Sequence, residues 1–162
     1  EVWKLVFEEY DTSDDEFKRI SEGLDGYMDE HKLEYKEILN DNAREIIEWL
    51  KEHGFKLGTA SSSYEKEINR MLTETGLTNY FDYVLSGKSF KQSKPCPDIY
   101  NAMVDMLGVE KEKCLVIEDS YYGIQAAINA NIDVAVLKDN KLGVNQSNGR
   151  IFINNLIEIK DL

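Results

Sequence analysis

Two adjacent carboxylates follow a short apolar segment, in a position suited to binding a divalent cation. Glu118 and Asp119 come directly after Cys114-Leu-Val-Ile117, a run typical of a buried strand. Adjacent anions repel, so the pair is costly unless a cation lies beside it, and Mg²⁺ takes one or two carboxylates together with substrate phosphate. The residues alone leave an alternative, in which Asp119 or Ser120 simply caps a following helix.

Lys94 is the second candidate, because it lies in the stiff segment Lys94-Pro-Cys-Pro-Asp98. A following proline favours an extended backbone at Lys94, so the loop can aim its ammonium as a fixed point charge. The alternative is a solvated surface lysine. Within the same segment, Asp98 is expected to begin a helix and Cys96 to pack without a chemical role.

The third candidate is Ser61, which ends a short strand and precedes Ser62 and Ser63. A helix N-terminus binds phosphate through its free N–H groups, and a serine hydroxyl there adds another hydrogen bond. Ser62 with Glu65 three residues later matches a capping box, so capping is its first interpretation. Phosphate binding beside Ser61 is the second role considered for Ser62.

Alternating helices and strands must position these side chains. Apolar periodicity predicts helices at about 43–53, 62–75, 98–107 and 120–131, and strands at 55–60, 81–85, 114–117, 134–137 and 151–153. This alternation predicts an α/β fold with a Rossmann-like parallel sheet and helices on both faces. The apolar strand 114–117 is expected to be buried on both of its faces. Ligands of such sheets bind at the carboxyl edge, where all three candidate groups fall.

The first 39 residues differ from the rest of the chain in composition and in apolar pattern. They are charged and helical in character, with no strand pattern, and we place a domain boundary near residues 39–41. The chain begins at Glu1, and its opening residues resemble the inside of a helix. We therefore expect an N-terminally incomplete piece of a longer protein.

Composition narrows the classes of partner. The chain has 162 residues and a formal net charge of −12, which disfavours nucleic acid and anionic membranes as partners. It contains no apolar run long enough to span a bilayer and no signal-peptide pattern. Its 2 cysteines are too few for a disulfide framework, and His31 and His53 have no metal-ligand spacing. A cytoplasmic location is therefore expected.

The order of these groups resembles three of the four signature motifs of the haloacid dehalogenase-like superfamily. The second, third and fourth motifs are matched by Gly58-Thr-Ala-Ser-Ser-Ser63, Lys94-Pro-Cys-Pro-Asp-Ile-Tyr100 and Val116-Ile-Glu-Asp-Ser-Tyr-Tyr-Gly-Ile124. The sequences of these motifs are most similar to those of the branch that includes β-phosphoglucomutase and related sugar-phosphate phosphatases. The resemblance covers roughly residues 41–155. By this resemblance, residues 1–39 are the C-terminal part of a helical cap and residues 40–162 are a phosphoryl-transfer core.

The resemblance also implies roles and a mechanism. Ser61 would bind the transferring phosphoryl group, with Ser62 beside it. Lys94 would neutralise that group's charge and hold a nucleophilic aspartate. Asp119 would bind Mg²⁺, as would Glu118 directly or through water. The substrate would be a small phosphorylated metabolite, and the reaction that of a phosphatase. A phosphomutase is the alternative, and a non-catalytic phosphate-binding relative or a receiver-like signalling domain are further ones.

One motif of the family is missing. Its first motif is Asp-x-Asp on the first strand, and no two aspartates of this chain are separated by one residue. In the family that strand lies centrally, between the strands ending at Ser61 and at Glu118–Asp119. Without it two buried edges lose their partner, and such edges invite association. Residues 1–162 alone are therefore expected to be unstable or inactive.

Overall fold

The computed structural model describes residues 19, 23, 34–138 and 145–162. The chain divides into two compact units, Glu1–Glu34 and Tyr35–Leu162, and the second carries the fold described below. Most of the predicted segment 1–39, with His31, lies outside the described residues. The helices of the second unit are α3 (Ala43–Glu52), α4 (Glu65–Glu74), α5 (Asp98–Leu107) and α6 (Tyr121–Asn129), with short 3₁₀ turns between them and a last one, η4 (Leu156–Asp161).

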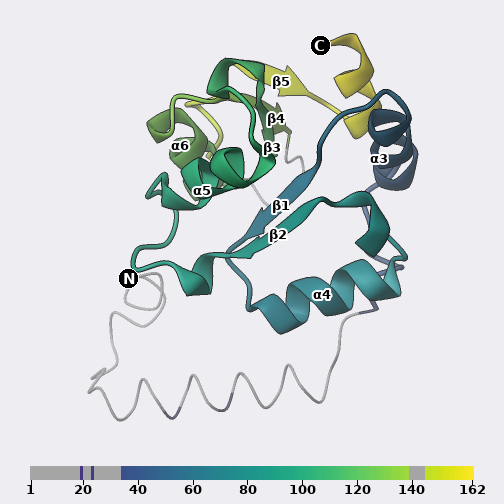
Figure 1. The fold of residues 1–162 in the computed structure, drawn as a ribbon, viewed down its shortest axis with the longest axis horizontal. Helices are drawn as coiled ribbons and strands as arrows, with labels where there is room; N and C mark the ends of the chain where they lie inside the picture. The colour runs from purple at the N-terminus through teal and green to yellow at the C-terminus, as the bar shows by residue number, and fades with distance from the viewer. Residues whose placement is uncertain (1–18, 20–22, 24–33, 139–144) are drawn as a thin grey trace. The chain divides into compact units, whose positions relative to one another are not determined.

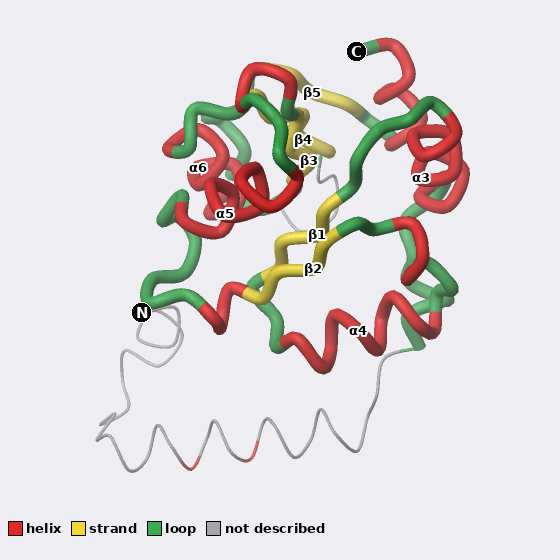
Figure 2. The backbone as a smooth tube through the Cα atoms, viewed as in Figure 1, coloured by secondary structure: helices red, strands yellow, loops and turns green. Residues whose placement is uncertain are grey.

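The strands form two parallel sheets (Figures 1 and 2). Strand β1 (Gly58–Ser61) pairs with β2 (Tyr83–Ser86) and ends opposite it, Ser61 against Ser86. The second sheet has the order β3 (Leu115–Glu118), β4 (Asp133–Leu137) and β5 (Ile151–Ile153). The predicted α/β fold with parallel strands is confirmed, and every strand lies within three residues of its predicted start.

Helices α5 and α6 cover one face of the sheets. Their apolar side chains form a core with alternate residues of β3 and β4, and Ala60 of β1 and Leu85 of β2 pack against the same core. Of the apolar repeat Ile99, Met103 and Leu107 predicted along α5, Ile99 joins this core and Met103 is also buried. Gly108 ends α5 in the left-handed conformation, with φ of 62°, which favours glycine.

Helices α3 and α4 cover the other face. Ile46 of α3 packs with Ala135 of β4, Ile153 of β5 and Ile159 of η4. Lys160 of η4 also donates a hydrogen bond of 2.9 Å to Glu45, which joins the two ends of this unit. Helix α4 packs against the first sheet, where Ile68 and Leu72 meet Val84 of β2.

Strand β3 departs from its prediction. Leu115 and Ile117 are 38% and 40% exposed, so the expectation that residues 114–117 are buried on both faces is wrong. Among the described strands β3 pairs only with β4, and β1 pairs only with β2. Val116 points into the core of α5 and α6, while Leu115 and Ile117 alternate to the opposite face. An edge strand lacks the neighbour that would complete that face.

Candidate active site

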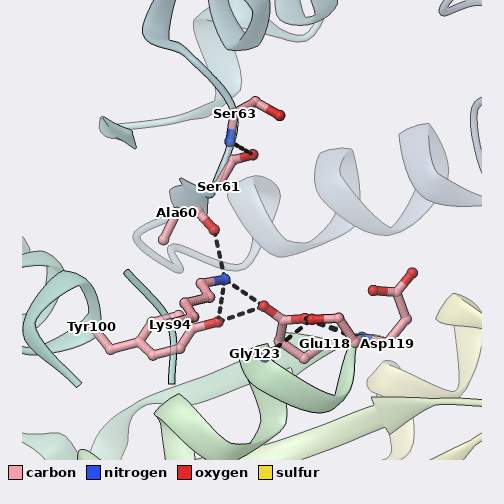
Figure 3. A network of polar contacts seen from close by, with 9 residues as sticks. Ala60, Ser61, Ser63, Lys94, Tyr100, Glu118, Asp119 and Gly123 are labelled. Atoms are coloured by element: carbon pink, nitrogen blue, oxygen red, sulfur yellow. Dashed lines mark hydrogen bonds and ion pairs between the residues drawn. The ribbon is translucent and has the colours of Figure 1, made fainter. Parts of the chain in front are cut away.

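Lys94 lies between the carboxyl ends of the two sheets (Figure 3). Its Nζ donates to the carbonyl oxygen of Ala60 in β1 at 3.1 Å and to Glu118 Oε1 at the end of β3 at 2.5 Å. The side chains of Lys94 and Glu118 are only 8% and 11% exposed, so this is a buried ion pair. The alternative of a solvated surface lysine is therefore excluded, and the Lys94 ammonium lies at the sheet edge.

Tyr100 completes the network around this ion pair. Its hydroxyl donates to Glu118 Oε1 at 2.7 Å and accepts a hydrogen bond of 2.9 Å from Lys94 Nζ. The ammonium also lies 4.8 Å from the centre of the Tyr100 ring. An ammonium has three N–H donors, and Ala60, Tyr100 and Glu118 occupy all three. A phosphoryl oxygen can therefore bind Lys94 only by replacing or sharing one of these acceptors.

The electrostatics of Glu118 follow from two opposing effects. Burial alone would raise the pKa of this carboxyl. The Lys94 charge, with hydrogen bonds from Lys94, Tyr100 and Ser120, outweighs burial and holds the pKa of Glu118 below its usual range. Burial and the Glu118 charge in turn raise the pKa of Tyr100, so its hydroxyl stays protonated. The network therefore keeps the Glu118 carboxylate ionised and the Tyr100 hydroxyl neutral over the ordinary range of pH.

Gly123 of α6 lies directly beneath the Glu118 carboxylate (Figure 3). A Cβ built at this glycine would lie 2.0 Å from Glu118 Cδ, far inside van der Waals contact. Ser120 caps the same helix, since its Oγ accepts the Gly123 N–H at 3.1 Å while donating to Glu118 Oε2 at 3.0 Å. Capping by Ser120, one of the two alternatives raised for the acidic segment, is confirmed. Ser120 fills the capping role, and Asp119 is not needed for it.

Asp119 is exposed just beyond the end of β3, and its carboxylate points away from the Lys94 ammonium (Figure 3). The oxygens of Glu118, by contrast, accept hydrogen bonds from Lys94, Tyr100, Ser120 and the Asp119 N–H. Within the described part of the chain, no group of three or more His, Cys, Asp or Glu side chains could hold a metal ion. Asp119 therefore places a carboxylate at this edge, which suits Mg²⁺ together with further oxygen ligands.

Ser61 ends β1 at the same edge. Its Oγ accepts the Ser63 N–H at 3.2 Å, and Ser63 O accepts the Ser86 hydroxyl at 2.6 Å. These bonds fix the loop that follows β1. The predicted capping role of Ser62 is wrong, because α4 begins only at Glu65, after Tyr64, without a side-chain cap. Ser62 is exposed in the loop between strand and helix, where the extended backbone at Tyr64 delays the first turn.

The predicted residues thus gather at one edge, and two of the structural predictions for other residues are confirmed. Asp98 begins α5, and His53 ends α3 with its ring nitrogen 2.7 Å from the Trp49 carbonyl oxygen. Cys96 is half-buried. Sequence reasoning did not assign Tyr100, although it closes the quoted third motif. A tyrosine two residues into a helix that starts beside Lys94 was the available indication.

Comparison with known proteins agrees with this geometry. The family described as haloacid dehalogenase-like hydrolase matches residues 3–137. A phosphorylated carbohydrates phosphatase of Thermotoga maritima is 36% identical over 107 residues, covering 65% of this chain and 50% of that protein. The chain spans about half the length of most of the curated relatives it matches. No described helix is long and apolar enough to cross a membrane.

Solved structures show the same fold. A predicted phosphoglycolate phosphatase from Haemophilus somnus superposes with a TM-score of 0.81 at 25% identity, over 98% of this chain and 72% of that one. A Thermotoga maritima protein described as a candidate β-phosphoglucomutase gives a TM-score of 0.69 at 28% identity, with the same two coverages. The resemblance seen in the motifs is therefore confirmed in sequence and in fold.

Proposed function

Because this chain belongs to the haloacid dehalogenase-like hydrolase family, we propose that its protein is a phosphatase of a small phosphorylated metabolite, such as a sugar phosphate. The observation that carries the proposal is the buried ammonium of Lys94, held between the ends of β1 and β3. Phosphoryl transfer needs positioning and compensation of charge on the equatorial oxygens, rather than new covalent chemistry from many side chains. A buried cation at the carboxyl edge of a parallel sheet supplies both.

The remaining groups each have a role in this proposal. The Ser61 hydroxyl, with Ser62 beside it, hydrogen-bonds the phosphoryl group at the end of β1. Lys94 exchanges one of its three acceptors for a phosphoryl oxygen, and Tyr100 is the neutral acceptor among them that carries no backbone constraint. Asp119, with Glu118 through water, holds Mg²⁺, which supplies further positive charge to the phosphoryl oxygens when bound. Glu118 itself orients Lys94.

The nucleophile belongs to a strand that these residues do not contain. We propose that an apolar strand ending in Asp-x-Asp pairs between β1 and β3, whose outer edges have no partner among the described strands. The partial exposure of Leu115 and Ile117 on β3 supports this, because such a strand would help to cover them. Residues 40–162 are then a core that lacks its first strand, residues 1–39 are part of a cap, and residues 1–162 alone are inactive.

Two alternatives remain within the same site chemistry. A phosphomutase would use the same groups and would return the phosphoryl group to a second hydroxyl of the substrate, and the structural likeness to a candidate β-phosphoglucomutase favours it. A phosphate-binding relative without catalysis would keep Ser61 and Lys94 and lack the nucleophile. Release of inorganic phosphate distinguishes the phosphatase from both.

The test compares variants of the full-length protein in a Mg²⁺-dependent phosphate-release assay over a panel of sugar phosphates and phosphoglycolate. Lys94→Ala should lower kcat by on the order of 10²–10³, as for loss of one transition-state donor. Lys91→Ala, an exposed lysine of the same loop, is the matched control and should keep kcat within about twofold. A loss under tenfold for a folded Lys94→Ala protein would remove Lys94 from the mechanism. Asp119→Ala should abolish activation by Mg²⁺.

A further inference from the structure

Gln146 bridges the carboxyl ends of β3 and β4. Its Nε2 donates to the carbonyl oxygen of Asp119 at 2.7 Å and to that of Leu137 at 2.9 Å. The paired residues of these strands end at Glu118 opposite Val136. The two carbonyls therefore belong to the next residues, one beyond the end of each paired segment. Gln146 joins the strands where the ladder itself has stopped.

The amide of Gln146 suits this contact. A primary amide has two N–H donors on one nitrogen, so it can satisfy two carbonyls of neighbouring strands at once. A glutamate at position 146 would have no N–H donor, and an asparagine would be one methylene too short to reach from the same backbone. Gln146 comes from a loop far along the chain, and its backbone carbonyl accepts the Gly149 N–H at 3.1 Å.

The bridge acts on Asp119. The Asp119 carbonyl is held by Gln146, and the Asp119 N–H lies 3.3 Å from Glu118 Oε2. Both backbone polar groups of this residue are therefore fixed, one on each side of its Cα. A fixed backbone sets the direction of the Cα–Cβ bond from which the Asp119 carboxylate extends, and so limits the positions that this carboxylate can reach. Partners that orient a metal ligand commonly change metal affinity by about tenfold to a hundredfold when removed.

We propose that Gln146 is a positioning residue for Asp119, which sets the direction of the metal-binding carboxylate by clamping the strand end beneath it. This role rests on the proposed function, in which Asp119 holds the divalent cation. It assigns to Gln146, which lies outside the three motifs, a part in metal binding that none of the motif residues indicates.

The experiment measures Mn²⁺ binding to the full-length protein by electron paramagnetic resonance, without substrate. Gln146→Met keeps the length of the side chain and removes both donors, and it should raise the Kd for Mn²⁺ by about tenfold to a hundredfold. Asn148→Ala is the matched control, because it removes another side-chain amide bond of the same loop, 3.0 Å to Gln125 Oε1, away from the strand ends. It should change the Kd by less than about twofold. Gln146→Asn should also weaken Mn²⁺ binding. It tests the positioning role of Gln146 if the Gln146→Met protein does not fold.

The outcomes distinguish the positioning role of Gln146 from the assignment of Asp119 as a metal ligand. If Asp119→Asn weakens Mn²⁺ binding and Gln146→Met does not, the positioning role is wrong and the metal assignment stands. Equal losses in Gln146→Met and Asn148→Ala would also overturn the role, because they would indicate a general effect of the loop. If Asp119→Asn itself leaves the Kd unchanged, the metal assignment fails and the role of Gln146 falls with it.

Discussion

Replacing Tyr100 by phenylalanine removes one oxygen atom from the centre of the buried network. The change deletes the 2.7 Å bond to Glu118 Oε1 and the 2.9 Å acceptor of Lys94 Nζ. It leaves the aromatic ring in place, so the contact of the ammonium with the ring face, at 4.8 Å, is retained. The ring fills the same space in the core, and no large cavity is created. The substitution therefore isolates the hydroxyl.

The expected cost follows from the charges involved. A hydrogen bond to a charged group contributes about 1.5–3 kcal/mol, and a buried donor left without its acceptor costs about 1–3 kcal/mol. These two terms overlap, because Lys94 keeps Ala60 and Glu118 as acceptors. We expect Tyr100→Phe to lower the free energy of unfolding by about 2–3 kcal/mol. With a slope of about 2 kcal/mol per molar urea, the unfolding midpoint falls by about 1–1.5 M.

The assay is urea unfolding of the full-length protein followed by far-ultraviolet circular dichroism. Tyr80→Phe is the control, because it deletes the same hydroxyl from a 3.0 Å bond to Glu48 Oε1, a carboxylate whose side chain is 40% exposed. That loss should cost about 0.5–1 kcal/mol. If the two variants differ by less than about 0.5 kcal/mol, the Tyr100 hydroxyl does not stabilise the ion pair and the reasoning fails.

Three further perturbations probe the same unit by unfolding measurements. Gly123→Ala forces the tightly bonded Glu118 carboxyl to move and should lower the free energy of unfolding by about 2–3 kcal/mol. Gly58→Ala is the control, because its added Cβ meets the flexible Met103 side chain, and it should cost less than half of that. Equal losses in the two variants would contradict this explanation. The lowered pKa of Glu118 stabilises the fold above the unfolded-state pKa of about 4.3, and this contribution is lost as pH falls through the folded-state value. Glu118→Gln should therefore flatten the dependence of stability on pH below about 4, and an unchanged slope would show that another carboxyl is responsible. Lys111→Met removes hydrogen bonds of 2.7 Å to Asn101 Oδ1 and 2.9 Å to the Ala130 carbonyl oxygen, and it should lower the free energy of unfolding by about 1–2 kcal/mol. Lys113→Met loses an exposed ion pair with Glu110 and should cost under about 0.5 kcal/mol. The reverse ranking would refute the stabilising role of the Lys111 hydrogen bonds.

The sequence predicts those parts of the fold and site that depend on local pattern. Apolar periodicity locates the helices and strands, because each element needs one apolar face whatever its neighbours are. The rule that ligands bind at the carboxyl edge then brings Ser61, Lys94 and Glu118 together without any knowledge of the contacts between them. The stiff segment around Lys94 is also a local feature, and a fixed position of the lysine ammonium could be predicted from it.

What the sequence does not predict depends on contacts between distant residues. The pairing of Glu118 with Lys94, and the place of Tyr100 beside both, arise only when the folded chain brings the start of α5 to the end of β3. Gln146 belongs to an irregular loop with no periodicity to interpret. The exposure of Leu115 and Ile117 depends on which strand lies next to β3, and an apolar run has the same appearance in either case. Helix α4 begins at Glu65, later than the capping pattern at Ser62 predicts, because the backbone at Tyr64 is extended.

The contact between α3 and η4 has a consequence for the order of folding. The strand pairs of both sheets join segments close in sequence, whereas the bond from Lys160 to Glu45 spans 115 residues. Contacts between distant residues carry the larger loop-closure entropy and form late. We therefore expect the strand–helix–strand units to form first and η4 to dock on α3 last. Ile159→Val would then speed unfolding and leave the folding rate unchanged, and a slower folding rate would place this contact in the nucleus. During synthesis, η4 emerges after all the site residues, so it completes this face of the core after them.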